Sequence, residues 1–240
     1  AAELLSDVEP PMRAAAALNL SRSGAQWCLF FAGMLGAWTV LLYLGAEHAQ
    51  GQPYEASLLG AFDLDRSIDL IRSLCLAGPG QFNFPALAGM WAVMSMAMMA
   101  PTAVPMLRSY QDLIAAGNGR LPNGAFWLLQ GGYLTVWMGY SLVAAGLQMQ
   151  LGRVGLLDAH GVSLSPLLTV WLLLGAGLYQ FTPLKDACLS KCRSPLAFFM
   201  SHWQPGPRGA FAMGLRHGAV CVGCCWALML LGFVGGTMNL

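Results

Sequence analysis

Sulfur and imidazole side chains recur at intervals of four residues near the C-terminal end of the sequence. The interval separates five residues, Met213, His217, Cys221, Cys225 and Met229, and Cys224 lies beside them. On a helix, residues four apart share one face, so their thioether, imidazole and thiol groups would form a ridge. Soft thiolates and thioethers prefer Cu(I), and thiolates also bind Zn(II). The pattern favours a metal or redox site, although cysteine also packs well as a small apolar residue.

A second cysteine pair precedes this ridge. Cys188 and Cys192 are four residues apart, and nearby Lys185, Lys191 and Arg193 would favour the thiolate form, which binds metals. Two ligands from this pair and two or three from the ridge would complete a tetrahedral site. The alternative is a pair of reduced thiols without a role, and spacing alone leaves both interpretations open.

Methionines dominate an apolar stretch earlier in the chain. Met90, Met94 and Met98 follow one another at intervals of four, and Pro101 and Pro105 come after them. The prolines should bend the helix and free backbone carbonyls. A methionine ladder could pass Cu(I) between weak sites. Methionine also fills gaps between packed helices, and without the cysteines that packing role would be the better interpretation.

The elements that carry these residues are predicted to cross a membrane. Of the 240 residues, 57% are hydrophobic and 10% are charged, whereas soluble domains have about 25% charged residues. Five stretches almost without charge each offer the roughly 20 residues that cross about 30 Å of hydrocarbon. They are 27–46, 84–107, 125–149, 164–182 and a fifth that follows His217 and runs through Asn239, with an earlier start possible near Gly209. Because lipid offers no hydrogen bonds, we expect an all-α, polytopic membrane protein with about five transmembrane helices in a single domain, residues 1–240.

Basic residues predict the orientation. Most of the lysines and arginines precede the first stretch, separate the second from the third, or separate the fourth from the fifth. The positive-inside rule then places the N-terminus and the cysteine-bearing loop 183–208 in the cytoplasm. The loop 47–82 faces outward, and apolar residues at helical spacing within 54–76 predict a short amphipathic surface helix there. We also expect segment 183–195 to fold back against the cytoplasmic end of the fifth helix, bringing Cys188 or Cys192 close to Cys221.

Other features limit the function. Two glycine pairs, Gly214 with Gly218 and Gly232 with Gly236, would let helices approach closely. The five stretches contain no Asp or Glu, and the sequence has neither a phosphate-binding loop nor a serine-hydrolase motif. An enzyme is therefore less expected than a binding or transport protein. The net charge of +1 argues against a nucleic-acid partner.

Three segments resemble a bacterial family of predicted metal-binding integral membrane proteins of unknown function. They are MWAVMSMAMMAPTAVP, GLYQFTPLKDACLSKCRSP and GAVCVGCCWALMLLGFVGGTMNL, and the resemblance covers about residues 84–240. By position it implies metal-site roles for Cys188, Cys192, Cys221, Cys224 and Cys225, and for Met90, Met94, Met98 and Met99. Family members usually continue past the position of Asn239 into a further apolar helix, so a sixth helix is expected to be missing here.

The leading hypothesis is a multi-pass protein of the bacterial inner membrane that binds a soft metal for handling or delivery. Copper, as Cu(I), is the first choice of metal and zinc the second. One alternative is a non-catalytic accessory subunit that packs its glycine faces against a larger membrane complex. A third is a thiol–disulfide redox protein that uses Cys188 with Cys192 or Cys221 with Cys224.

Overall fold

A computed structural model describes residues 24–42, 83–116, 124–158 and 161–235, and these residues form an all-helical protein. Within them there is no strand, only an isolated antiparallel bridge between Leu157 and Ser163. A helix at Gly24–Leu42 comes first. The long helices that follow are α3 (Phe84–Ala116), α4 (Ala125–Arg153) and α8 (Gly206–Met229). The shorter ones are α5 (Pro166–Tyr179), α6 (Pro183–Arg193), α7 (Pro195–His202) and α9 (Gly232–Gly235).

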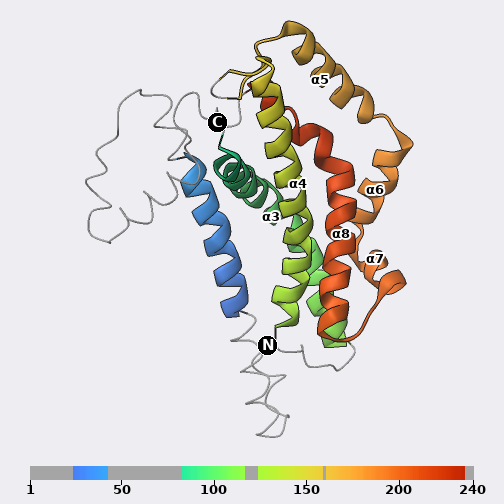
Figure 1. Cartoon of the computed structure of the whole chain (residues 1–240). Helices are drawn as coiled ribbons and strands as arrows, with labels where there is room; N and C mark the ends of the chain where they lie inside the picture. The colour runs from blue at the N-terminus through green and yellow to red at the C-terminus, as the bar shows by residue number, and fades with distance from the viewer. Residues whose placement is uncertain (1–23, 43–82, 117–123, 159–160, 236–240) are drawn as a thin grey trace, which may run out of the picture.

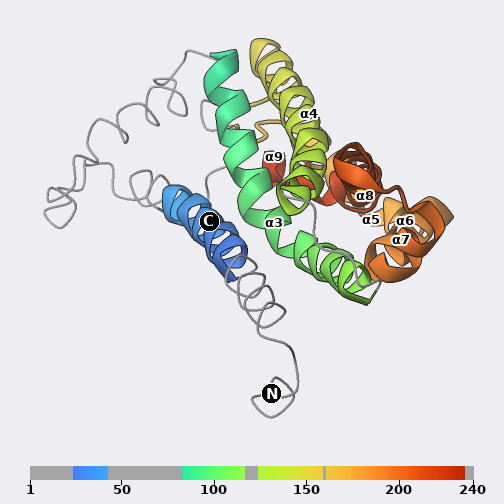
Figure 2. The ribbon, with the colours of Figure 1, turned by 90° about the horizontal axis from the view of Figure 1, so that it is seen from below.

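The helices stand in a row, with the Gly24–Leu42 helix beside α3, then α4, then α8, and with α6 and α7 beyond α8 (Figures 1 and 2). The first helix is fixed to its neighbours by Trp27, whose indole nitrogen donates to Gln111 at 3.0 Å and whose ring packs on Phe126. Its predicted helical state is confirmed. The row places the cysteine-bearing helices α6 and α8 next to each other.

Helices α4 and α8 pack closely against each other, and glycines make the approach possible. A methyl group on Gly214 would lie 2.1 Å from the carbonyl oxygen of Leu129, and one on Gly132 would lie 2.2 Å from that of Phe211. Gly218 faces the carbonyl oxygen of Tyr133 in the same way, at 3.0 Å. Backbones can touch here only because these positions lack side chains. The close packing predicted at the first glycine pair is confirmed, whereas Gly236 lies outside the described residues.

Helices α3 and α4 are joined by buried polar pairs. The Trp91 indole donates to the Gln148 side chain at 2.7 Å, and the hydroxyls of Ser95 and Ser141 lie 3.1 Å apart. Each pair satisfies polar groups that would otherwise be costly inside an apolar interface. The ends of α3 point in different directions (Figure 2), and two prolines, Pro101 and Pro105, lie in its middle part. The predicted bend agrees with this course.

The fourth predicted stretch, 164–182, is not one straight helix. Ser165 caps α5 and Pro166 begins it, and its 14 residues cover about 21 Å. That length falls short of the hydrocarbon thickness of about 30 Å. Thr182 then caps α6 and Pro183 begins it, so the chain starts a new helix, and α6 is bent from α5 by 63°. The two together could form one broken span or a re-entrant pair.

The segment after this break is also more ordered than a loop. Helices α6 and α7 occupy most of 183–208, which the charge pattern had suggested was a loop. Helix α8 begins at Gly206, so the earlier start of the fifth stretch is confirmed. Among the described residues, three helices are long and apolar enough to cross a membrane: Gly24–Leu42, Phe84–Ala116 and Gly206–Gly235. Counting the bent pair gives four, and the number of five stays a prediction. The 47–82 loop with its amphipathic helix lies outside the described residues.

Candidate metal centre

Three cysteine sulfurs converge between α6 and α8. The sulfur atoms of Cys192, Cys221 and Cys224 all lie within 4.8 Å of one another. Cys192 comes from α6 and the other two from α8, because α6 runs alongside α8 (Figure 1). The predicted approach of segment 183–195 to Cys221 is confirmed. It occurs farther along the helix than expected, since α8 begins at Gly206 and Cys221 follows about 22 Å from that start.

The spacing of the sulfurs suits a soft metal ion. Two metal–sulfur bonds of about 2.3 Å span at most about 4.6 Å, so small side-chain rotations would bring all three sulfurs to one ion. Cys221 and Cys224 are buried and Cys192 is half-buried, which keeps water away. The sulfur of Cys225 lies 3.3 Å from that of Cys224, so a fourth thiol stands beside the group. These residues can therefore hold a metal through three thiolates, with a fourth in reach.

Cys188 is placed differently from its partner Cys192. Its sulfur lies 2.8 Å from the point that a methyl group on Gly223 would occupy. The missing side chain of Gly223 therefore leaves the space that the Cys188 sulfur fills on the surface of α8. Cys188 does not belong to the group of three converging sulfurs. The predicted cysteine pair thus divides into one residue in the centre and one beside it.

Tyr133 and Thr102, which the sequence did not indicate, touch the centre. The hydroxyl of Tyr133 lies 3.2 Å from the sulfur of Cys221, and the hydroxyl of Thr102 lies 3.8 Å from it. The two hydroxyls are 2.8 Å apart, and both donate to the backbone carbonyl of Met99. Tyr133 comes from α4 and Thr102 from α3, so hydroxyls from two other helices lie against Cys221. A signal for Tyr133 existed, because it directly follows Gly131 and Gly132, where a neighbouring helix could approach.

His217 lies one turn before Cys221 on α8 and is 1% exposed. Its Nδ1 atom has no hydrogen-bond partner among the described residues. Its ring packs edge-on against Phe198, with centroids 5.4 Å apart, and lies 6.3 Å from the ring of Tyr133. A buried nitrogen without a partner is costly, and a metal ion is one group that would satisfy it. His217 does not belong to the three-thiol group, so it stands next to the centre and not within it.

The predicted methionines lie in the core of the helix row. Met90 and Met94 are buried among apolar side chains, and Met98 is half-buried against them. The link from this helix to the thiols runs instead through the Met99 carbonyl, Thr102 and Tyr133. This placement agrees with the role of methionine as a packing residue between helices. The methionine ladder for Cu(I) stays a prediction.

Comparison with known families supports the chemistry of these thiols. The model of the PpoB2 family, described as copper chaperones, matches residues 88–240. The chain belongs to this family. The matched region contains every cysteine of the centre as well as Thr102, Tyr133 and His217. The three segments predicted a metal-binding family, and the match confirms a copper-related one. The membrane location and the bacterial origin stay predictions. No curated protein and no solved structure gives a significant match.

Proposed function

We propose that this protein is an integral membrane copper chaperone that holds Cu(I) between α6 and α8 and delivers it to a partner protein. One observation carries the proposal: three thiol sulfurs from two helices lie within 4.8 Å of one another, inside the region matched by a copper chaperone family. Thiolates are the protein ligands that soft Cu(I) prefers. A chaperone must also release its metal, and a site shared between two separate helices can open when they part.

The ligand set supports Cu(I) over zinc. Structural zinc takes four ligands in a tetrahedron, which would require Cys225 to join the other three thiols. Cu(I) accepts fewer ligands and carries one positive charge less. Binding Cu(I) through two of the thiolates leaves one net negative charge in the interior, whereas binding Zn(II) through four thiolates leaves two. A small net charge is favoured in an apolar interior, where charges are expensive.

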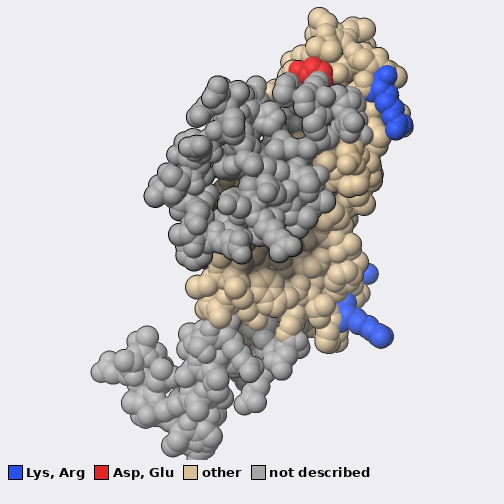
Figure 3. Space-filling model, turned by 60° about the vertical axis from the view of Figure 1, so that its left-hand side comes forward, with Lys and Arg blue, Asp and Glu red and all other residues tan. Residues whose placement is uncertain are grey.

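Apolar surface supports placement in a membrane. The three apolar helices have the length of membrane spans. The only buried residue of α5 is Ala176, while Leu167, Trp171 and Leu178 are each about two-thirds exposed, at 66%, 67% and 69%. On the face in Figure 3, the charged side chains of the described residues gather toward the two ends, with an uncharged stretch between them. Exposed apolar surface of this extent is typical of contact with lipid or a membrane partner. We place the protein in the bacterial inner membrane, with a cytoplasmic N-terminus and without a nucleic-acid partner.

Fewer structural observations support the other two hypotheses, an accessory subunit and a thiol–disulfide protein. An accessory subunit would use its glycine faces for a partner, but Gly132, Gly214 and Gly218 already serve the contact between α4 and α8. A thiol–disulfide protein needs an accessible pair that cycles between two states. Cys221 and Cys224 are buried, which slows exchange with a partner thiol. Copper handling is therefore the function that these residues support best.

Metal analysis of the purified chain tests the proposal. Wild-type protein, prepared in detergent and loaded with Cu(I) under reducing conditions, should retain stoichiometric copper after desalting. A variant with Cys192, Cys221 and Cys224 changed to Ser should fold and lose that copper, because hydroxyls are hard, weak ligands for Cu(I). Cys28→Ser is the matched control, since Cys28 is an exposed thiol on the first helix. Full copper in the triple variant would contradict the proposal, and so would a wild-type preference for zinc.

A further inference from the structure

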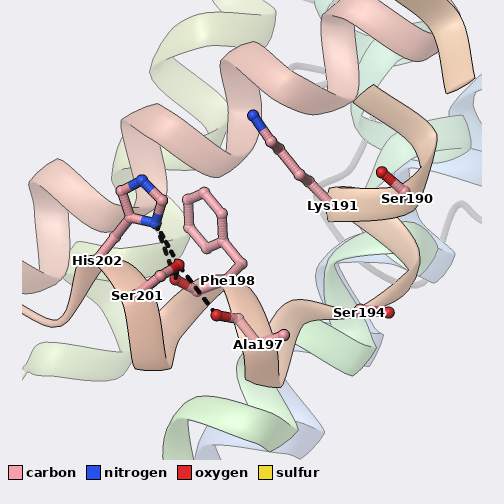
Figure 4. Close-up of a pocket in the computed structure, with 7 residues that line it drawn as sticks. All are labelled: Ser190, Lys191, Ser194, Ala197, Phe198, Ser201 and His202. Atoms are coloured by element: carbon pink, nitrogen blue, oxygen red, sulfur yellow. Dashed lines mark hydrogen bonds between the residues drawn. The ribbon is translucent and has the colours of Figure 1, made fainter. Parts of the chain in front are cut away.

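A pocket on the protein surface lies between α7 and α6, the helix that carries Cys192. Its volume is about 210 Å³, and Ser190, Lys191 and Ser194 line one side of it. Ala197, Phe198, Ser201 and His202 of α7 line the other. Lys191 precedes Cys192, so one wall of the pocket belongs to the same turn of α6 that brings a thiol into the centre. Figure 4 shows the rings of His202 and Phe198 side by side on α7, with Lys191 extending from α6.

Aromatic contacts connect this pocket with the buried histidine. The ring of His202 stacks on Phe198, with centroids 4.9 Å apart, and Phe198 also packs edge-on against His217, with centroids 5.4 Å apart. His217 is buried one turn before Cys221, and its Nδ1 lacks a partner among the described residues. One phenyl ring therefore contacts both an exposed imidazole in the pocket and a buried imidazole one turn before Cys221.

The tautomer of His202 suits a metal ligand. Its Nδ1 lies 3.1 Å from the carbonyl oxygen of Phe198 and 2.8 Å from the hydroxyl of Ser201. A carbonyl oxygen can only accept a hydrogen bond, and the Ser201 hydroxyl has its own acceptors in the carbonyl oxygens of Ala197 and Phe198. A neutral ring with its proton on Nδ1 therefore satisfies both contacts. The Nε2 lone pair is then free to bind a metal. Metal-binding histidines are commonly oriented in this way, by a hydrogen bond from the ring nitrogen that does not bind the metal.

We propose that the pocket between α6 and α7 is the entrance through which Cu(I) reaches the thiols, with His202 as its surface ligand and His217 as a buried intermediate ligand. The inference rests on the proposed Cu(I) binding at Cys192, Cys221 and Cys224. The step is an exchange of ligands without change of oxidation state. An imidazole nitrogen replaces one donor ligand on Cu(I), and the ring of Phe198 moves aside. The thiols of the centre then lose their protons to solvent, and the resulting thiolates replace the imidazoles on the metal.

Lys191 indicates the charge of the copper donor. An ammonium group at the pocket repels a bare cation and attracts an anion. Copper presented by two thiolates of a donor protein, or by an anionic chelator, carries net negative charge. Lys191 therefore favours docking of an anionic Cu(I) complex at the α6 side of the pocket.

Loading kinetics test the entrance. The full chain in detergent is mixed rapidly with the anionic Cu(I) complex of bathocuproine disulfonate, whose absorbance falls as copper transfers to the protein. His202→Gln should slow loading about tenfold, or about 1.4 kcal/mol in the barrier, while the equilibrium affinity stays at the wild-type value. Ser190→Ala is the matched control, because Ser190 lines the same pocket without a soft ligand. His217→Leu should slow loading as well. If that buried variant misfolds, the loading rate of His202→Gln alone decides the test.

If His202→Gln loads copper at the wild-type rate, the proposal that this pocket is the copper entrance is wrong. An equilibrium affinity that falls by the same factor as the rate would overturn it too, since His202 would then act on the final site. Failure of the wild-type chain to take copper at equilibrium would contradict the proposed function itself. Lys191→Gln should slow loading from the anionic complex but not from cationic Cu(I)–acetonitrile, and equal slowing with both donors would refute the charge argument.

Discussion

The hydroxyl oxygen of Tyr133 lies 3.2 Å from the sulfur of Cys221, at the contact between α4 and α8. Tyr133 also donates to the Met99 carbonyl at 3.0 Å, and Thr102 donates to the same oxygen at 2.8 Å. When Cys221 gives up its proton to a metal, Tyr133 can turn its own proton toward the thiolate. Thr102 then keeps the carbonyl satisfied. The network therefore suits both the empty and the metal-bound thiol.

Replacing Tyr133 by Phe removes this donor and keeps the ring in place. We expect the Tyr133→Phe variant to bind Cu(I) about tenfold more weakly, at the lower end of the range for loss of a hydrogen bond to a metal ligand. Competition with a chromophoric Cu(I) chelator measures the change. Tyr140→Phe is the matched control, because Tyr140 also lies on α4 and donates to a backbone carbonyl of α8, that of Trp226, at 3.1 Å. Equal effects of the two substitutions would mean that Tyr133 acts only through packing.

Gly214→Ala tests the close approach of α4 and α8. The added methyl group would lie 2.1 Å from the carbonyl oxygen of Leu129, so the helices must separate. Overpacking of this kind costs about 1–3 kcal/mol, and the midpoint of thermal unfolding in detergent should fall. Gly139→Ala is the control on α4, where nothing lies within 4 Å of the added methyl group. It should leave stability equal or raise it by up to about 1 kcal/mol, because alanine favours helix more than glycine does.

The sequence predicted the helices and most of the centre for physical reasons that the structure makes clear. Long uncharged apolar runs leave helix as the available structure, and α3 and α4 contain the predicted stretches 84–107 and 125–149. Spacing by three and four residues placed Cys221 and Cys224 on one side of α8. The rotation of one helix against another is set by backbone approach at positions such as Gly132 and Gly214, and the apolar pattern does not encode it.

That rotation explains what the sequence left open. Cys188 and Cys192 are one turn apart on α6. The rotation of the helices places the Cys192 sulfur near those of Cys221 and Cys224, whereas the Cys188 sulfur packs against Gly223. The rotation also brings Tyr133 to Cys221. The break before α6 was readable in principle, because Thr182 followed by Pro183 is a helix-start signal. The predicted fourth stretch, 164–182, stops at that signal, but it includes residues 180–182, which join α5 to α6.

The two cysteines of α6 should behave differently. Cys192→Ser removes a member of the converging group, so its Cu(I) affinity should fall by at least the ~10–100-fold that losing a hydrogen bond to a ligand costs. Cys188→Ser should keep the wild-type affinity, because its sulfur fills space at Gly223. The same chelator competition compares them. A larger loss in Cys188→Ser than in Cys192→Ser would show that α6 is rotated relative to this structure.

Changing Met90, Met94 and Met98 together to Leu separates packing from copper movement. Leucine keeps the apolar volume, so each replacement should cost less than about 1.5 kcal/mol and the thiols should bind Cu(I) as before. If the methionines pass copper, its transfer across vesicles that contain the protein should slow, because leucine has no sulfur. Transfer at the wild-type rate would leave these methionines as core residues only.

The orientation in the membrane can be read from two single thiols. With the other native cysteines changed to Ser, one variant keeps Cys75 of the predicted outward loop, and a second carries only Ser190→Cys. Position 190 is chosen as the labelling site because Ser190 is exposed on α6, whereas the native Cys188 is half-buried against α8. An impermeant thiol reagent added to intact cells should label Cys75 and leave position 190 unlabelled until the membrane is permeabilised. The reason is the excess of Lys and Arg around 183–208, which the positive-inside rule keeps in the cytoplasm. Labelling at 190 but not at 75 would reverse the orientation and would place the proposed copper entrance on the outer face.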